Sequence, residues 1–191
     1  MKVILASQSP RRRELLGMTG LDFVVQAADI DETMDPAKDP YDEVARVSRL
    51  KALAVKREPE DIVVAADTIV VCGGQVLGKP KDEADALRML RSLSGRTHQV
   101  MTGMTVLCGE RRVTVTEQTG IHFRTLSDRE ILSYIATGDP MDKAGAYGIQ
   151  GGAALFATGI EGDYYNVMGL PVCRLAVILR SFGCEILGES L

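Results

Sequence analysis

The chain has 191 residues, of which 46% are hydrophobic and 5% aromatic, with no tryptophan and a formal net charge of −4. The hydrophobic fraction is that of a globular protein with a buried core, and the length allows either one larger domain or two small lobes. Few aromatic side chains and a negative charge disfavour binding to single-stranded or duplex nucleic acid, so we expect a small-molecule substrate and no nucleic-acid partner.

Cysteine usage and hydropathy indicate the compartment. Cys72, Cys108, Cys173 and Cys184 form no CxxC pair and have no regular spacing. Because each lies in or beside an apolar run, we expect free thiols in a reducing, cytoplasmic compartment. Arginines 11–13 interrupt the first apolar run, which argues against a secretory signal, and no stretch of 18 continuous apolar residues predicts a membrane span.

The first predicted elements are a strand at residues 3–6 and a helix that begins after Ser9, a good N-cap residue. Arg11, Arg12 and Arg13 then fill the first helical turn, where positive charge opposes the helix dipole. Such a turn is either a solvated basic surface or a place where guanidinium and backbone N–H groups hold an anion. Successive helical side chains point about 100° apart, so we expect Arg11 and Arg12 to bind the ligand and Arg13 to be structural.

Strand and helix patterns alternate along the rest of the chain. The apolar run 62–66 is typical of a strand buried on both faces, and we expect it to end at Asp67 and Thr68 before strand character resumes at 69–72. The other predicted strands are 23–25, 75–77, 100–108, 113–123 and 155–156, and the other helices are 40–57, 83–93, 128–137 and 171–183. Two predicted hairpins require antiparallel pairs, which indicates an α/β fold with a mixed sheet.

Carboxylates follow two of the predicted strands. Asp67 lies at the expected end of a buried strand, where open α/β sheets place reactive groups, and Asp31 and Glu32 follow strand 23–25. Taken singly, these residues are more often turn formers or solvated loop residues. Together with the arginine turn they suit a magnesium-dependent reaction on a phosphorylated substrate, because Mg²⁺ prefers hard oxygen ligands and binds substrate phosphates as well.

Two lysines and an amide complete the candidate residues. Lys51 within a helix and Lys79 in the turn 77–80 would each be assigned to the surface alone, but beside the arginines they would neutralise a triphosphate. A Walker-type P-loop is excluded because no GxxxxGK[ST] motif is present. The glycine-rich segment 142–152 is either a flexible surface loop or a backbone shaped to approach a ligand, with Gln150 able to pair with a base edge.

Several short motifs follow one another in a specific order. They are LASQSPRR (5–12), DE (31–32), AADT (65–68), LGKP (77–80), TG (102–103), DKAGAYGIQG (142–151), GDY (162–164) and NV (166–167). Each is weak alone, but in this order and spacing they resemble the Maf family of nucleotide pyrophosphatases over nearly the whole chain. The departures are Asp139, where glutamate is frequent, and the third arginine. Neither is expected to affect the matched chemistry.

The resemblance implies a single domain, residues 1–191, made of two lobes, with a mixed sheet flanked by helices and a deep central cleft. This fold is related to that of the inosine triphosphate pyrophosphatases. The implied reaction is hydrolysis between the α- and β-phosphates of a nucleoside triphosphate, in the branch that prefers dTTP and UTP. The resemblance implies Asp67 as the catalytic base, and the acidic residues Glu32 and Asp67 suit Mg²⁺ or Mn²⁺.

The remaining expectations concern the substrate and the partners. Residues expected to bind the nucleotide are Ser7, Arg11, Arg12, Lys51, Thr68, Lys79 and Gln150, of which Thr68 and Gln150 would read the pyrimidine edge. Two alternatives stay open: modified pyrimidine triphosphates as substrates in a house-cleaning role, and a non-catalytic regulator of septum formation that acts through protein contacts. The resemblance also suggests a homodimer.

Overall fold

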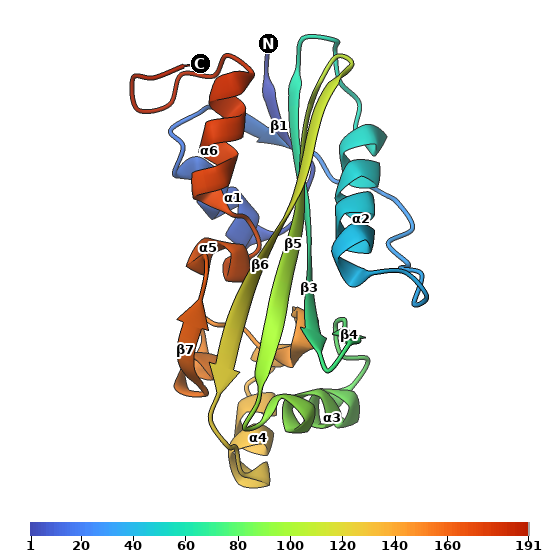
Figure 1. The fold of residues 1–191 in the computed structure, drawn as a ribbon, viewed down its shortest axis with the longest axis vertical. Coiled ribbons are helices and arrows are strands. Elements are labelled where there is room, and N and C mark those ends of the chain that lie inside the picture. The colour runs from blue at the N-terminus through green and yellow to red at the C-terminus, as the bar shows by residue number, and fades with distance from the viewer. Residues whose placement is uncertain (191) are drawn as a thin grey trace. The chain divides into compact units, whose positions relative to one another are not determined.

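The computed structural model describes residues 1–190 and has a mixed α/β architecture (Figure 1). Its strands are β1 (Val3–Leu5), β2 (Phe23–Val25), β3 (Ile62–Cys72), β4 (Gln75–Leu77), β5 (Thr97–Cys108), β6 (Arg111–Phe123) and β7 (Ala157–Glu161). They form a seven-stranded sheet of order β2-β1-β3-β5-β6-β7, with β4 paired to β3. Because β1 pairs in parallel with β2 and β3 while β4 and β7 pair antiparallel, the predicted mixed sheet is confirmed.

Six α-helices and three short 3₁₀ helices occur within residues 1–190. They are α1 (Pro10–Gly17), α2 (Pro40–Ala54), α3 (Glu83–Leu93), α4 (Asp128–Ile135), α5 (Tyr164–Met168), α6 (Val172–Ser181), η1 (Asp139–Asp142), η2 (Ala144–Ala146) and η3 (Gly152–Leu155). None of these helices is both long enough and apolar enough to span a membrane.

The chain divides into two compact units, each made of several segments. Unit 1 comprises Met1–Asp67, Thr102–Glu117 and the chain from Gly169 onward, and unit 2 comprises Thr68–Met101 and Gln118–Met168. Strands β3, β5 and β6 contribute residues to both units. Asp67 and Thr68, adjacent in the sequence, therefore belong to different units.

The core of unit 1 follows from continuous apolar strands. Residues 62–66 of β3 are fully buried, and Val3, Ile4 and Leu5 of β1 are also buried, as expected for central strands covered on both faces. Helix α2 packs on them through small or branched side chains such as Ala52, which clusters with Ile4 and neighbouring strand residues. The apolar pattern of the sequence thus accounts for this core.

Helix α2 approaches β5 closely at Gly103. An ideal Cβ built at Gly103 would lie 2.3 Å from the carbonyl oxygen of Val44, well inside van der Waals contact. The helix begins with Asp39 as N-cap, whose side chain accepts a hydrogen bond from the Tyr41 N–H at 2.9 Å. Because α2 carries Lys51 in its last turn, the absence of a side chain at Gly103 sets the position of that lysine.

The core of unit 2 contains a cluster of ring side chains. His98, Phe123 and Tyr147 meet edge to face with centroids 4.9–5.4 Å apart, and Tyr134 and Phe156 pair in the same way at 5.3 Å. Such pairs favour one packing arrangement beyond the area that they bury. Tyr147 comes from the glycine-rich segment, so that segment is part of the core of unit 2.

The prediction that a strand ends at Asp67 was wrong, because β3 runs without interruption from Ile62 to Cys72. A carboxylate is disfavoured inside a strand when it lacks a partner, but that of Asp67 is bound by Lys51 at 2.7 Å. The β-branched Thr68 follows and suits extended backbone. Asp67 therefore projects from within a strand.

Three further differences from the predicted elements concern a helix end, a strand that is absent and a helix that was missed. The helix expected to reach residue 57 ends at Ala54, because Val55 has extended backbone and a side chain that is 4% exposed. Residues 155–156 are not a strand: Leu155 ends η3, and β7 begins at Ala157. The short helix α5 was not predicted.

Replacing Gly103 with alanine should destabilise the protein by about 1–3 kcal/mol, because the new methyl group would overlap the backbone of Val44 and push α2 outward. Any activity that depends on the position of Lys51 should fall as well, since this lysine would move with the helix. Chemical denaturation and initial rates measure the two effects.

Gly17→Ala is the matched control, since no atom lies within 4 Å of a Cβ built there and its φ is not positive. We expect it to be neutral or slightly stabilising. Equal stability of the two variants would contradict the close approach at Gly103.

Candidate active site

Three predicted residues from different elements of unit 1 meet at one ammonium group. Lys51 Nζ, from α2, donates to Asp67 Oδ1 of β3 at 2.7 Å and contacts Glu32 Oε2, in the loop after β2, at 2.8 Å. The side chains of Lys51 and Asp67 are 9% and 12% exposed, whereas that of Glu32 is 54% exposed. The cluster is therefore buried at Lys51 and Asp67 and exposed to solvent at Glu32.

The geometry of this cluster has an electrostatic cause. A buried ammonium group costs several kcal/mol unless it is paired, and two neighbouring carboxylates repel each other unless a cation lies between them. Lys51 satisfies both requirements by binding Asp67 and Glu32 at once. The two acidic side chains consequently converge on one position for positive charge.

The arginine turn lies beside this cluster. Arg12 Nε donates to the carbonyl oxygen of Gly169 at 2.9 Å, and its Nη1 donates to Ser7 Oγ at 3.4 Å. Burial lowers the pKa of Arg12 and the nearby charge of Arg11 lowers it further, while the Asp67 and Glu32 carboxylates act in the opposite direction. Arginine stays protonated at neutral pH despite such shifts, so guanidinium and carboxylate charges share this region of unit 1.

The start of α1 has the predicted cap. Ser9 Oγ accepts from the Arg12 N–H at 3.4 Å, and Ser7 Oγ accepts from the Ser9 N–H at 3.2 Å. Arg11 is half-buried, whereas Arg13 is exposed. Arg11 and Arg13 thus differ in environment, and the Asp67 and Glu32 carboxylates lie near enough to Arg12 to affect its pKa.

Two residues that the sequence analysis missed hold the loop that carries Glu32. Arg46 donates to both oxygens of Glu43 at 2.8–2.9 Å and to the carbonyl oxygen of Thr33 at 2.8 Å, while the Asp35 N–H donates to Glu43 at 2.9 Å. The hydrogen bond from Arg46 is the main cause that lowers the pKa of Glu43 to about 2. The i, i+3 spacing of Glu43 and Arg46 could have indicated this ion pair, although the same spacing is also typical of solvated pairs on a helix surface.

The other three predicted residues, Thr68, Lys79 and Gln150, belong to unit 2. Thr68 is half-buried on β3, and both Lys79 and Gln150 are exposed. The turn that carries Lys79 is joined to the glycine-rich segment by a hydrogen bond from the Gly145 N–H to the Gly78 carbonyl oxygen at 3.0 Å. Within unit 2, the structure therefore connects the backbones that carry Lys79 and Gln150.

The glycine-rich segment is packed and is not a flexible surface loop. Gly145, Tyr147 and Ile149 are buried, while Gln150 between Ile149 and Gly151 is exposed. Gly145 has a φ of +68°, and a Cβ there would lie 2.9 Å from Val70 Cγ2. Glycine at this position permits both the left-handed backbone and the close approach to β3.

A buried histidine anchors the same segment. His98 is 1% exposed, and its Nε2 forms a hydrogen bond with the Tyr147 hydroxyl at 2.8 Å. Burial lowers the pKa of His98 to about 4, so the ring is neutral at physiological pH. Within residues 1–190, no protein group bonds to its Nδ1.

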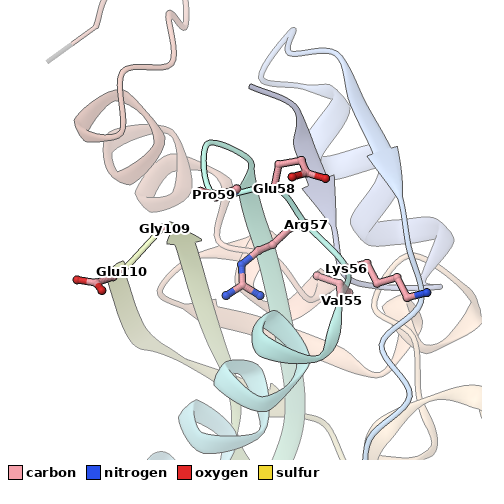
Figure 2. Close-up of a pocket in the computed structure, with 7 residues that line it drawn as sticks. All are labelled: Val55, Lys56, Arg57, Glu58, Pro59, Gly109 and Glu110. Atoms are coloured by element: carbon pink, nitrogen blue, oxygen red, sulfur yellow. The ribbon is translucent and has the colours of Figure 1, made fainter.

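A separate hollow of about 520 Å³ lies in unit 1, where residues 55–59 follow α2 and Gly109 and Glu110 join β5 to β6 (Figure 2). Its lining carries charges of both signs, from Lys56, Arg57, Glu58 and Glu110 among others. None of the predicted site residues lines it, so the candidate site and this hollow are different places.

Unit 1 thus presents carboxylates that converge on a cation, next to guanidinium groups on a capped helix, which is the chemistry of a phosphate- and metal-binding enzyme site. The model of the family described as Maf-like protein matches residues 2–182. The chain therefore belongs to the Maf family.

Relatives of known description cover almost the whole chain. The proteins named dTTP/UTP pyrophosphatase from Geotalea uraniireducens (strain Rf4) and Bacillus pumilus (strain SAFR-032) are 51% and 48% identical to it, over 95% of this chain and 95% and 97% of theirs. The protein of the same name from Symbiobacterium thermophilum is 50% identical over 97% of this chain and 96% of its own. A HAM1 protein structure from Coxiella burnetii gives a TM-score of 0.49 at 13% identity, covering 94% of this chain and 98% of that one, a likeness too distant to assign any residue.

The buried His98 should make stability fall in mild acid. The unfolded chain takes up this proton near pH 6.5 and the folded chain near pH 4, so stability is lost as the pH falls between these values, by about 3 kcal/mol in total. We expect His98→Gln to show a smaller loss from pH 7.5 to pH 4.5 in urea unfolding.

Tyr165→Phe provides the control, because it removes no histidine and Tyr165 is 39% exposed. Its pH dependence should match that of the unmodified protein. If His98→Gln also matched the unmodified protein, the assignment of a neutral, buried His98 would be incorrect.

Proposed function

We propose that this chain is a nucleoside triphosphate pyrophosphatase that converts dTTP and UTP to the monophosphate and pyrophosphate. The observation that carries the proposal is the convergence of Asp67 and Glu32 on the Lys51 ammonium group, beside the half-buried Arg12. Near-full-length relatives named dTTP/UTP pyrophosphatase, at about 50% identity, support the choice of nucleotide.

The residues present fit a divalent metal ion such as Mg²⁺ or Mn²⁺. One oxygen of Glu32 and one of Asp67 both lie within 2.8 Å of Lys51 Nζ, so both carboxylates can reach a single cation. Within residues 1–190, no group of three or more His, Cys, Asp and Glu side chains could hold a metal. Two carboxylates from the protein, with substrate phosphates and water as the other ligands, form the environment in which proteins commonly bind Mg²⁺.

In the proposed complex, Ser7, Arg11, Arg12 and Lys51 bind the phosphate chain. Guanidinium groups donate paired hydrogen bonds to phosphate oxygens, and Lys51 would exchange one carboxylate for a phosphate as the nucleotide binds. The metal, when bound, neutralises charge on the phosphates. These cations would stabilise the negative charge that develops on the departing pyrophosphate, which is the main contribution of proteins to phosphoryl-type transfer.

Asp67 would act on the attacking water. Its carboxylate accepts a proton from the water as the water oxygen forms a bond to phosphorus. With pyrophosphate as the leaving group, the attacked atom is the α-phosphorus, and its bond to the oxygen bridging the α- and β-phosphates breaks at the same time. The electron pair of that bond stays on the bridging oxygen, which leaves as part of the pyrophosphate. Lys51 and the surrounding β3 backbone hold Asp67 in a fixed direction for this transfer.

The roles of Thr68 and Gln150 are carried from the family resemblance, and that of Lys79 from its positive charge. Thr68 and Gln150 would read the pyrimidine edge, and Lys79 would bind the triphosphate. An exposed amide such as that of Gln150 offers both a donor and an acceptor, which complements the N–H and carbonyl groups of uracil and thymine. The homodimer and the cytoplasmic location stay predictions.

Pyrophosphate release from a panel of normal and modified nucleoside triphosphates, with Mg²⁺ or Mn²⁺, tests the proposed function. We expect dTTP and UTP to be the preferred canonical substrates. Asp67→Asn should lower kcat by about 10²-fold or more, because the amide cannot accept the proton of the attacking water.

Asp22→Asn is the control, since Asp22 is an exposed carboxylate of the same unit. It should retain full activity, and circular dichroism should show that both variants are folded. Full pyrophosphate release by folded Asp67→Asn would sink the catalytic assignment, and a lack of release from every nucleotide would favour a non-catalytic role.

A further inference from the structure

The hydroxyl group of Tyr134 links a carboxylate to the backbone of the glycine-rich segment. It donates to Asp139 Oδ2 at 2.6 Å and accepts from the Gly148 N–H at 3.1 Å. Tyr134 is 5% exposed, and burial is the main cause that raises its pKa. The hydroxyl therefore keeps its proton at physiological pH and can donate and accept at the same time.

Asp139 is itself held from a second direction. Lys143 Nζ lies 3.1 Å from Asp139 Oδ1 and donates to the Asp139 carbonyl oxygen at 2.6 Å. Each carboxylate oxygen of Asp139 thus has its own partner, Tyr134 on one side and Lys143 on the other. Asp139, the residue that departs from the usual glutamate of the family, is in direct contact with the matched segment 142–151.

This network lies against the turn that carries Gln150. A hydrogen bond from the Gly151 N–H to the Gly148 carbonyl oxygen at 3.0 Å closes the turn, with Gln150 at its exposed corner. A Cβ at Gly151 would lie 2.7 Å from Asp139 Oδ2, and a Cβ at Gly148 would lie 2.7 Å from Lys143 Cε. The turn therefore has no room to move toward Asp139 or Lys143.

The residue before the turn is fixed independently. Tyr147 is buried and bound by His98 at 2.8 Å, and Ile149 within the turn is 9% exposed. Gln150 consequently projects from a backbone that is anchored at Tyr147, at Gly148 and at Ile149. The Cα–Cβ bond of Gln150 therefore leaves the turn in a fixed direction, which narrows the positions that its exposed amide can reach before any ligand arrives.

We propose that Tyr134 and Asp139 are positioning residues that orient Gln150 toward the nucleobase and so determine selectivity among nucleoside triphosphates. This inference rests on the proposed function, in which Gln150 reads the pyrimidine edge. A rigid amide discriminates because a base with the wrong donor and acceptor pattern leaves buried polar groups unpaired. A mobile amide would rotate to match either the correct or the wrong pattern of donors and acceptors on the base.

A double-mutant cycle between Tyr134→Phe and Gln150→Ala tests the inference. The ratio of kcat/KM for UTP to that for CTP is measured in all four proteins. We expect Tyr134→Phe to lower this ratio about tenfold, the size of one oriented hydrogen bond, through a raised KM for UTP with little change in kcat. In the Gln150→Ala background the same change should have no further effect on the ratio.

Conservative changes separate positioning from folding. Asp139→Asn keeps an oxygen that can accept from Tyr134 and should retain most of the selectivity, whereas Asp139→Ala should lose it. Tyr165→Phe, at a tyrosine of the same unit that is 39% exposed, is the matched control and should leave the ratio unchanged. Thermal melting of each variant shows whether it is folded.

Either of two results would overturn the inference alone: an unchanged ratio in folded Tyr134→Phe, or an equal loss of selectivity with and without Gln150. If Gln150→Ala keeps full selectivity, both the inference and the base-reading role of Gln150 are overturned. The proposed hydrolysis is tested separately, by pyrophosphate release from the unmodified protein and from Asp67→Asn.

Discussion

The ammonium group of Lys51, bound between Asp67 and Glu32, is the interaction on which the candidate site depends. Without the Lys51 ammonium group between them, the carboxylates of Asp67 and Glu32 would repel each other. Without these carboxylates, the buried charge of Lys51 would be strongly disfavoured. Each group is stable only because the others are present. The candidate site is therefore built from charges that balance one another, and the proposed metal and phosphate chain would replace one set of these contacts with another.

Contacts away from the chemistry maintain this arrangement. Gly103 allows α2 to lie against β5, and the Glu43–Arg46 pair holds the loop of Glu32 to the same helix. One helix thus supplies the central lysine and positions one of its two partners. In unit 2 the Tyr134 hydroxyl has a similar part toward the turn of Gln150. In both cases, polar side chains outside the proposed chemistry hold the backbone that carries a candidate site residue.

Local sequence patterns predicted much of the fold and of the candidate site. Apolar runs located the central strands, and the capping box at Ser127 and Glu130 located the start of α4. That only some of the three arginines face a ligand, as their helical spacing indicates, stays a prediction. What local patterns missed depends on partners distant in the sequence. Asp67 stays within a strand because Lys51, 16 residues away, binds its carboxylate.

Dependence on partners distant in the sequence also explains why the roles of Gly103 and Tyr134 were not predicted. The need for glycine at residue 103 arises from the backbone of α2, about 60 residues earlier in the chain, and the role of Tyr134 arises from a turn 14 residues later. The family motifs include Gly103 and Gly151, but the motifs alone do not say why glycine is needed at these positions. The structure supplies the reason as close approach, at Gly103 to Val44 and at Gly151 to Asp139.

Binding of Mn²⁺ tests most directly whether Glu32 and Asp67 form a cation site that the nucleotide completes. The protein-bound metal is measured by electron paramagnetic resonance, with and without a UTP analogue whose α–β bridging oxygen is replaced by a methylene group. We predict weak binding to the protein alone, much tighter binding with the analogue, and loss of the tight binding in Glu32→Gln and in Asp67→Asn. Tight binding that both variants retain would contradict the account.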